Sequence, residues 1–302
     1  MCKKQKSIKS WNLKIAKPLY CFFLAIILLI IPLNAESLSG PEISFSSNEM
    51  DCGSLILVMI KNNGTEEPLV TWMKKKISLV YCQANDAWVG FIGADLNQKA
   101  GLYKVVIQLP GYSFEKSFCI RINDKDYGTR RLKLPRKKVE LDADSVKRAK
   151  REAAVIRSIW SADNTLPKWD GAFLMPIDGD IVGTFGKRSI INNLRRAPHT
   201  GVDQAGNKGD PVRAINNGKV ILIANHFFSG NSLYLDHGGG IISMYFHLDK
   251  ILVDKEDDIK KGEVIGILGA TGRVTAPHLH WGVRINGARI NPLTLIELSN
   301  TL

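Results

Sequence analysis

The stretch Thr275-Ala276-Pro277-His278-Leu279-His280-Trp281-Gly282-Val283 decides how the second half of this 302-residue chain is interpreted. Apolar and polar residues alternate along it, which predicts a β-strand. Side chains two apart on a strand share a face, so His278 and His280 can reach one metal ion or one water molecule. The chain has only six histidines, and the positions of the others therefore matter.

A second polar pair lies upstream, where His199 and Asp203 are four residues apart. Two histidines and one acid suit a catalytic Zn²⁺, because three protein ligands leave a fourth position open for water. A straight strand would hold residues four apart at about 13 Å, whereas two ligands of one zinc lie about 3 to 3.5 Å apart. The chain must therefore bend between them. Gly201 is expected to allow the bend, since glycine accepts backbone angles closed to other residues.

Each pattern alone has an ordinary explanation. A single His-x-x-x-Asp occurs by chance in many chains, and a lone histidine near a strand end is usually a surface or capping residue. The coexistence of both patterns, each preceded by proline and accompanied by glycine, favours a metal site. A cysteine-rich zinc site near these histidines is excluded by sequence proximity, because all five cysteines lie in the first half of the chain: Cys2, Cys21, Cys52, Cys82 and Cys119.

With these residues in place, positions 174 to 295 resemble the LytM/lysostaphin-type zinc metallopeptidases, which cut peptide cross-links in bacterial cell walls. The matching segments occur in family order and are Phe185-Gly186, His199-Thr200-Gly201-Val202-Asp203, Gly209-Asp210-Pro211-Val212, Gly218-Lys219-Val220, Asp236-His237-Gly238, Tyr245-Phe246-His247-Leu248, Lys261-Gly262-Glu263-Val264-Ile265-Gly266, Gly269-Ala270-Thr271-Gly272 and Pro277-His278-Leu279-His280.

The resemblance implies the site residues. His199, Asp203 and His280 would hold one zinc ion per chain, and His247 and His278 would be the catalytic histidines beside it. A neighbouring imidazole can accept a proton from the attacking water and return one to the leaving amine. The spacing does not tell which of the two histidines is the general base and which stabilises the oxyanion.

The resemblance also implies a function, namely hydrolysis of peptide cross-links in peptidoglycan. The two-domain layout and the segment Phe228-Ser229-Gly230-Asn231 look like Gram-negative members, which favours D-alanyl-meso-diaminopimelate bonds. Asn193 stands where staphylococcal members carry a tyrosine, and Ala276 stands where glycine is common. No ligand or catalytic histidine is missing. The alternative, a non-catalytic cell-wall-binding or amidase-activating module with the same fold, is therefore weakened but stays open.

The expected fold is mainly β. Short strands between glycine-marked turns predict an antiparallel domain at 173–298 without a helix before 295, and the resemblance implies a duplicated hybrid motif. A faint repeat, 208–212 against 261–265, agrees with that duplication. Biotinyl or lipoyl carrier function is disfavoured, because none of the glycine-flanked lysines has the flanking residues that carriers present. His237 is expected to end a strand at a turn, and His226 to lie in a loop.

The first half predicts an immunoglobulin-like β-sandwich at 40–134, with strands near 54–60, 77–81, 88–92, 102–109 and 114–122. Two of Cys52, Cys82 and Cys119 could pair in an oxidising compartment, or all three could be buried thiols. A linker at 135–172 follows, in which acidic capping residues and apolar residues at helical spacing predict a helix over 143–160. Its apolar stripe is expected to be core, and whether it or the first domain covers the site is open.

Residues 1–36 are expected to be a signal peptide or membrane anchor, because lysines precede a short apolar run at 19–31 and Ala35 precedes a polar switch. The protein would then be periplasmic or exported, or anchored to the inner membrane if the segment is not cleaved. The formal charge of +12 is half due to six lysines of this segment. The remaining excess suits an acidic wall or membrane surface and does not indicate nucleic acid. Nothing in the sequence specifies the oligomeric state. A basic cluster is expected to be a solvated face: Arg130, Arg131, Lys133, Arg136, Lys137 and Lys138.

Overall fold

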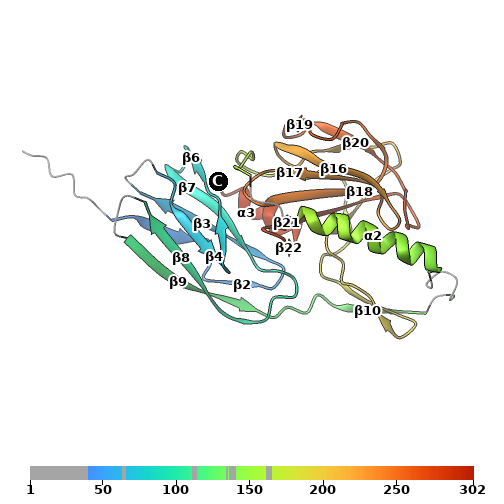
Figure 1. Ribbon diagram of the computed structural model, residues 1–302, viewed down its shortest axis with the longest axis horizontal. Coiled ribbons are helices and arrows are strands. Elements are labelled where there is room, and N and C mark those ends of the chain that lie inside the picture. Colours follow the sequence, from blue (N-terminus) through green and yellow to red (C-terminus); the bar gives the residue numbers. More distant parts are fainter. Residues whose placement is uncertain (1–39, 63–65, 111–113, 134, 136–140, 161–164) are drawn as a thin grey trace, which may run out of the picture. The chain divides into compact units, whose positions relative to one another are not determined.

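Antiparallel sheets make up most of the chain, as the sequence predicts (Figure 1). The computed structural model describes residues 40–62, 66–110, 114–133, 135, 141–160 and 165–302. The signal segment predicted at 1–36 lies outside the described residues. Within them, no helix is both long enough and apolar enough to cross a membrane.

Two sheets in the first part of the chain share one hydrophobic core. Their strand orders are β1-β3-β7-β6 and β2-β9-β8-β4-β5. The strands are β1 (Glu42–Phe45), β2 (Glu49–Asp51), β3 (Leu55–Lys61), β4 (Leu69–Trp72), β5 (Lys75–Ile77), β6 (Val80–Cys82), β7 (Ala87–Gly93), β8 (Gly101–Leu109) and β9 (Phe114–Asn123). Val58 from one sheet and Trp72 and Ile107 from the other are buried in the same cluster. This part is therefore a β-sandwich, and its immunoglobulin-like character stays a prediction.

The strand predicted at 77–81 is wrong, because the chain changes sheets within it. β5 ends at Ile77 in one sheet, and β6 begins at Val80 in the other. Leu79 is buried at the crossing, and its backbone N–H donates to the Glu67 carboxylate at 3.1 Å. Because apolar and polar residues keep alternating where the chain passes from one sheet to the other, the sequence pattern does not show the change of sheet.

The expectations for the sandwich cysteines are also wrong. Cys52, Cys82 and Cys119 are all free, and only the first of them is buried. They therefore form neither a disulfide pair nor a set of three buried thiols.

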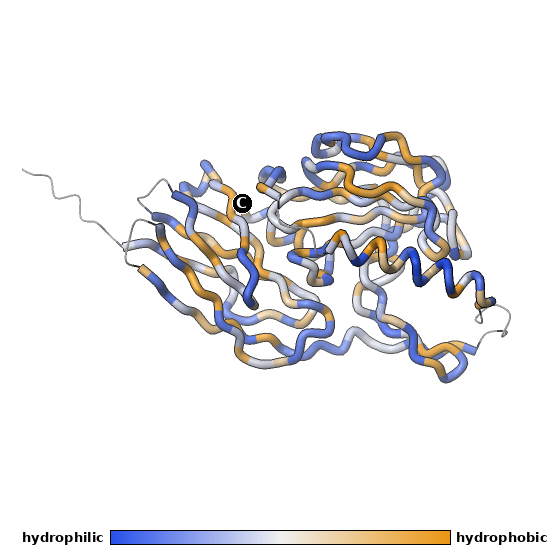
Figure 2. The backbone as a smooth tube through the Cα atoms, in the orientation of Figure 1, coloured by the Kyte–Doolittle hydropathy of each residue, from blue (hydrophilic) through white to orange (hydrophobic). Residues whose placement is uncertain are grey.

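A large antiparallel sheet carries the second part of the chain. Its main order is β11-β14-β21-β18-β17-β16-β19. In addition, β20 pairs with β18 and β15, and β22 pairs with β21. Its strands are β11 (Ile181–Gly183), β14 (Val202–Ala205), β15 (Pro211–Arg213), β16 (Gly218–His226), β17 (Gly230–Asp236), β18 (Ile241–Ile251), β19 (Asp258–Ile259), β20 (Val264–Leu268), β21 (His278–Ile285) and β22 (Ala288–Ile290). Hydrophobic and hydrophilic positions follow each other closely along these strands (Figure 2).

Strand β21 shows why the opening stretch folds as it does. Leu279 and Trp281 are fully buried, whereas His278 and His280 are partly exposed. Burial of each large apolar side chain stabilises the fold by about 1.5–3 kcal/mol. The alternation therefore fixes one face of β21 to the core and turns both imidazoles to the other face.

The faint repeat corresponds to two equivalent turns. Gly209 and Gly262 both have positive φ, 106° and 79°. They lead into β15 and β20, which pair antiparallel with Val212 opposite Gly266. The two related segments thus lie side by side in the same sheet.

A terminal helix was missed, because the second domain was expected to be without helix up to residue 295. α3 spans Pro292–Ser299, with proline in its first turn. The Asn291 side chain caps it by accepting the Leu293 N–H at 3.3 Å. Asparagine followed by proline is a common helix start, so the sequence did contain the signal.

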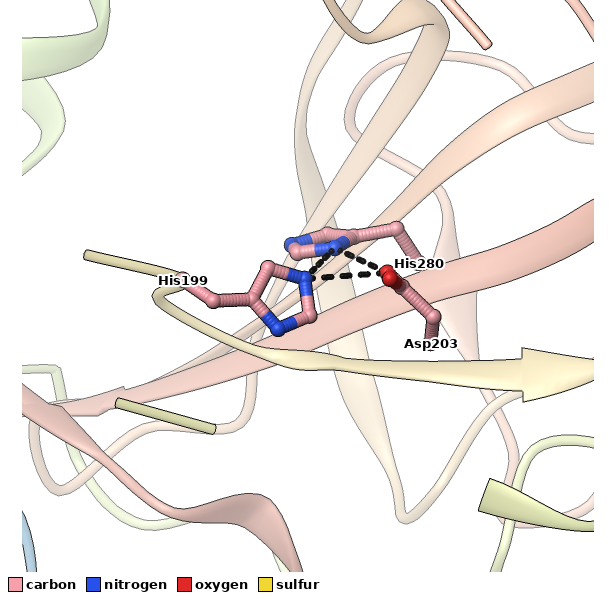
Figure 3. A group of neighbouring side chains, drawn as sticks. All are labelled: His199, Asp203 and His280. Carbon is pink, nitrogen blue, oxygen red and sulfur yellow. Dashed lines mark hydrogen bonds and ion pairs between the residues drawn. The ribbon is translucent and has the colours of Figure 1, made fainter. Parts of the chain in front are cut away.

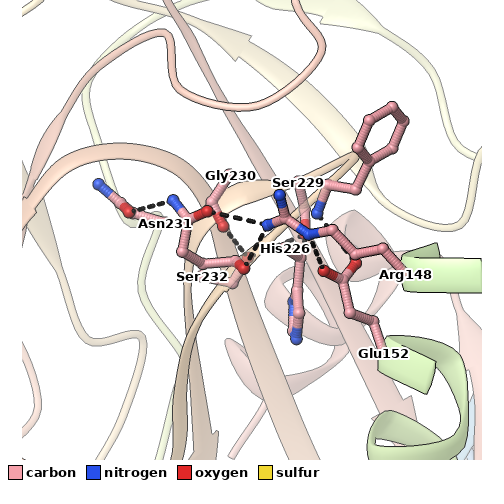
Figure 4. A network of polar contacts seen from close by, with 9 residues as sticks. Arg148, Glu152, His226, Ser229, Gly230, Asn231 and Ser232 are labelled. Carbon is pink, nitrogen blue, oxygen red and sulfur yellow. Dashed lines mark hydrogen bonds and ion pairs between the residues drawn. The ribbon is translucent and has the colours of Figure 1, made fainter. Parts of the chain in front are cut away.

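The linker helix α2 spans Ala143–Ile159, close to the predicted 143–160. None of its residues is buried, so the expectation that its apolar stripe is core is wrong. It is held by polar contacts to the end of β16 and to the turn that follows it (Figure 4). Arg148 Nη2 donates to Asn225 O at 2.9 Å, and Glu152 Oε2 accepts the Phe227 N–H at 2.9 Å.

A small sheet with the order β10-β12-β13 completes the fold. Its strands are β10 (Thr129–Leu132), β12 (Arg188–Ile191) and β13 (Leu194–Arg195). Asn192 and Asn193 connect β12 to β13 and have φ of 51° and 63°. Two residues with positive φ are what a tight hairpin of type I′ requires, and asparagine tolerates that geometry. Asn193 therefore serves the turn.

His237 is a core residue. It follows β17, as expected, and it is completely buried. Nδ1 lies 2.7 Å from Asn217 O, and Nε2 lies 2.7 Å from Ser243 Oγ. Burial lowers its pKa from the ordinary 6.5 to about 4, so the ring is neutral near pH 7.

We expect this histidine to make stability depend on pH. Between pH 6.5 and 4 the unfolded chain binds the proton and the folded chain does not, so stability is complete above pH 6.5 and falls as the pH decreases. The loss between pH 7 and 5 should be about 2 kcal/mol. Urea unfolding at both pH values should show a smaller loss for His237→Gln than for the wild type. An equal loss in both proteins would contradict this assignment.

Candidate metal centre

His199, Asp203 and His280 come together on neighbouring strands. Asp203 on β14 lies directly opposite His280 on β21 in the sheet register. His199 precedes β14, and its backbone is joined to Gly186 and Lys187 by hydrogen bonds of 2.8 and 3.0 Å. The three side chains point toward one another (Figure 3). The structure therefore brings together the three residues that the sequence resemblance implies as ligands.

The ligand atoms are close enough to share one ion. His199 Nε2 lies 3.0 Å from Asp203 Oδ1 and 2.9 Å from His280 Nδ1. His280 Nδ1 lies 2.8 Å from Asp203 Oδ1. Two nitrogens and one carboxylate oxygen are a ligand set that suits Zn²⁺.

The hydrogen-bond partners of His199 test whether a cation fits. Its Nδ1 lies 2.9 Å from Thr184 O, and a carbonyl oxygen only accepts, so Nδ1 carries the hydrogen. In the neutral ring, Nε2 is then unprotonated and directs its lone pair at Asp203 Oδ1. Two facing lone pairs repel each other unless a proton or a metal ion lies between them. The residues thus fit a metal ion, and Thr184 orients one ligand as backbone carbonyls commonly do in metal sites.

The electrostatics of the cluster favour positive charge. Burial opposes protonation of His199, but Asp203 outweighs it, and the pKa of His199 is raised. Burial would likewise raise the pKa of Asp203, yet hydrogen bonds from both histidines hold it well below its usual range. Burial lowers the pKa of His280. Asp203 is therefore ionised, and its charge draws a cation into the cluster.

His278 and His247 lie at the edge of this cluster, as the resemblance implies. His278 Nε2 is 3.7 Å from Asp203 Oδ1, and its Nδ1 lies 2.9 Å from Ala276 O. The rings of His247 and His278 have centroids 5.0 Å apart. His247 Nδ1 lies 2.9 Å from Thr271 O. In both rings the carbonyl contact places a hydrogen on Nδ1 and leaves Nε2 to exchange a proton.

The backbone at His247 is strained. Its φ is 64°, which a non-glycine residue rarely adopts and which is common at functional sites. The conformation is held by a hydrogen bond of 2.9 Å from the His247 N–H to Ser229 O. Burial also lowers the pKa of His247 to about 4. This imidazole is thus fixed in position and neutral near pH 7.

Sequence reasoning missed several contacts that position the ligands. The Phe246 ring stacks on His280, with centroids 5.4 Å apart and an interplanar angle of 4°. The carbonyls of Thr184, Thr271 and Ala276 orient three of the imidazoles. Backbone carbonyls carry no residue-specific signal, whereas Phe246 had one, since it directly precedes His247.

Gly201 was expected to supply a backbone angle closed to other residues, and this reason is wrong. Its φ is not in the left-handed region. Its Cα instead passes so close to β21 that a Cβ there would lie 2.3 Å from Trp281 O and 2.8 Å from His280 Nε2. Glycine is needed at this position for space.

The loop assignment of His226 is also wrong. This residue ends β16 in a regular pairing with Gly230 of β17, and it is buried. It therefore does not lie in a loop beside the ligand cluster.

Gly183 on β11 gives a sharp test of the Asp203 position. A Cβ at residue 183 would lie 2.2 Å from Asp203 Oδ2, so Gly183→Ala should displace the carboxylate. We expect zinc affinity to fall at least tenfold, the order seen when support around a ligand is lost. Competition with a chromogenic chelator measures it. Val182→Ala, at an exposed neighbour, should leave affinity unchanged, and an equal loss in both variants would refute the explanation.

Comparisons with known proteins match the part of the chain that carries these residues. The model of the family described as Peptidase family M23 matches residues 197–292. The chain is similar to "Peptidoglycan DD-endopeptidase ShyA" of Vibrio cholerae, with 41% identity over 121 residues, 39% of this chain and 28% of that protein. It is also similar to "DD-carboxypeptidase/endopeptidase Mpg" of Neisseria meningitidis serogroup B, with 40% identity over 97 residues, 32% of this chain and 22% of that protein.

A solved structure covers more of the chain. A peptidase M23 crystal structure from Pseudomonas aeruginosa matches with a TM-score of 0.64 and 29% identity, over 82% of this chain and 95% of that one. The similarity thus extends beyond the region of the family match. By contrast, this chain spans only about a quarter of the length of the curated relatives.

Proposed function

We propose that this chain, whose residues 197–292 match the model of peptidase family M23, is a zinc-dependent endopeptidase that hydrolyses peptide cross-links in peptidoglycan. The observation that carries the proposal is the convergence of His199 Nε2, Asp203 Oδ1 and His280 Nδ1 within hydrogen-bond distance of one another. Two further imidazoles lie beside them. A purely structural site would not need these two groups.

The chain's own residues account for the proton movements. His199, Asp203 and His280 would hold the metal, which when bound supplies Lewis-acid activation of water and of the scissile carbonyl. One of His247 and His278 accepts a proton from the attacking water at Nε2 and delivers it to the leaving amine. The other donates a hydrogen bond from Nε2 to the developing oxyanion, for which its ring must carry hydrogens on both nitrogens. Both rings are oriented for this work by their Nδ1–H bonds to Thr271 O and Ala276 O.

The proposed bond is the cross-link between D-alanine and meso-diaminopimelate. Two relatives support this choice by name, since one is called a peptidoglycan DD-endopeptidase and the other a DD-carboxypeptidase/endopeptidase. Both come from bacteria with Gram-negative walls. Action on such a wall requires export, and the signal predicted at residues 1–36 would supply it, either cleaved or retained as an inner-membrane anchor.

Digestion of purified sacculi tests the proposal. We expect the zinc-loaded protein to convert cross-linked muropeptide dimers into monomers, as seen by chromatography and mass spectrometry. The products should carry a new amino group on diaminopimelate and a new carboxylate on D-alanine. A folded protein that holds zinc, binds sacculi and leaves the dimers intact would instead be the non-catalytic wall-binding or amidase-activating module.

A further inference from the structure

Two basic segments about 60 residues apart in sequence meet beside the metal centre. β10 pairs in parallel with β12, with Arg130 opposite Ser189 and Arg131 opposite Ile190. Seven exposed cations surround the small sheet: Arg130, Arg131, Lys133, Lys187, Arg188, Arg195 and Arg196. Among the residues that the structure describes, none of the seven forms an ion pair with a carboxylate. Their charge is available to an anion.

Arg130 differs from its neighbour Arg131 in direction. Successive side chains on a strand point to opposite faces, so the two arginines lie on different faces of the small sheet. Arg131 shares its face with Arg195, because both are opposite Ile190. Arg130 Nε donates to Ser189 Oγ at 2.8 Å. This bond fixes the side chain and leaves its two terminal NH₂ groups for a ligand.

Ser189, which accepts the hydrogen bond from Arg130, lies on β12, and the chain segment that carries His199 runs beside this strand. Residues after the β12-β13 hairpin run back along β12, where the Arg196 N–H donates to Ser189 O at 2.9 Å and the His199 N–H donates to Lys187 O at 3.0 Å. Ser189, which holds Arg130, is therefore only two residues from Lys187, the backbone partner of His199.

We propose that Arg130 is a specificity residue that binds a carboxylate of the substrate's stem peptide beside the scissile bond. The proposal rests on the proposed function, because stem peptides with meso-diaminopimelate carry free carboxylates. A planar guanidinium pairs with a carboxylate through two parallel N–H bonds. Arg130 precedes the region matched by the family model, which begins at residue 197. Arg130 would therefore be a site residue supplied by β10, a strand that the family model does not include.

A single carboxylate explains the arrangement better than an extended anionic surface does. An anionic membrane would engage several cations at once, and Arg131 and Arg195 share a face suited to that. Arg130 instead lies on the other face and is fixed by its side-chain bond to Ser189. A fixed guanidinium loses less conformational freedom when it binds one ligand group.

The test compares two soluble cross-linked dimers that differ only in whether the stem-peptide carboxylates are free or amidated. We expect the wild type to prefer the free acid. Arg130→Gln should raise KM for the free acid about tenfold or more, because a hydrogen-bonded charge is lost, and should change the amidated dimer little. The value of kcat should change less than KM, as for an interaction present before and during reaction. Arg130→Lys should recover part of the loss.

Arg131→Gln is the matched control, since it removes the same charge from the next residue of the same strand. It should behave as the wild type toward both dimers. Equal losses in the two variants would overturn the proposal in favour of general charge attraction. Binding to phosphatidylglycerol vesicles that Arg130→Gln abolishes, with cleavage unchanged, would overturn it in favour of a membrane surface.

Two outcomes separate this proposal from the function on which it rests. A wild type that cleaves both dimers equally well would overturn the carboxylate subsite and leave the endopeptidase function intact. A zinc-loaded wild type that cleaves neither dimer would overturn both. Zinc content and thermal unfolding of Arg130→Gln should match the wild type, because the side chain is exposed and a purely structural role would change them.

Discussion

Replacing His280 with alanine is expected to remove zinc from the purified protein and to lower the rate of dimer cleavage by about a thousandfold or more. His280 contributes one of the three converging atoms, at 2.8 Å from Asp203 and 2.9 Å from His199. With two protein ligands left, the affinity for zinc should fall sharply. Metal content by atomic emission and cleavage of sacculi measure the two effects independently.

The matched control for this variant is His226→Ala, which removes a different imidazole, a buried one, from the same sheet. The His226 ring packs against Tyr234 rather than against any of the proposed ligands. The control should therefore keep its zinc and its activity. If His280→Ala kept both zinc and activity while folded, the assignment of the metal centre would be wrong.

The side of the strand to which His278 and His280 point could be predicted, because alternation along a strand decides which side chains face the core. Alternation along 275–283 places Leu279 and Trp281 in the core, and both histidines must then face the other way. That His280 is the ligand beside Asp203 was implied only by the family resemblance, and the register of β14 and β21 places the two residues opposite each other. What the pattern could not contain is the orientation of each imidazole, since backbone carbonyls such as Thr184 O and Thr271 O set it.

The contribution of β10 could not be predicted for a different reason. A run of basic residues looks like a solvated face, and local periodicity says nothing about a parallel partner some 60 residues later. Only the register of β10 against β12 shows that Arg130 and Arg131 lie on opposite faces of the small sheet and that Arg130 is bonded to Ser189. The prediction of one strand at 77–81 was wrong for the same reason. Local alternation does not show strand pairing, and the two halves of this segment join different sheets.

The second large effect is expected when the proton-transferring histidines are replaced one at a time. His247→Asn and His278→Asn should each lower kcat for dimer cleavage by about 10²–10⁴, while zinc content stays near that of the wild type. Asparagine suits position 247, because it tolerates the positive φ of 64° found there. Its amide can also donate to Thr271 O in place of the ring.

The pair should act as a unit, so the double variant is expected to lose little more than the worse single variant. The pH profile then separates the two roles. Loss of the general base removes the acidic limb of the kcat/KM profile, whereas loss of the oxyanion donor, a ring protonated at both nitrogens, removes the basic limb. A variant that keeps a third or more of the wild-type kcat would exclude its histidine from proton transfer. His278, whose Nε2 lies 3.7 Å from Asp203, is placed to exchange a proton next to the ligand cluster, and His247, held neutral by burial, is placed beside it.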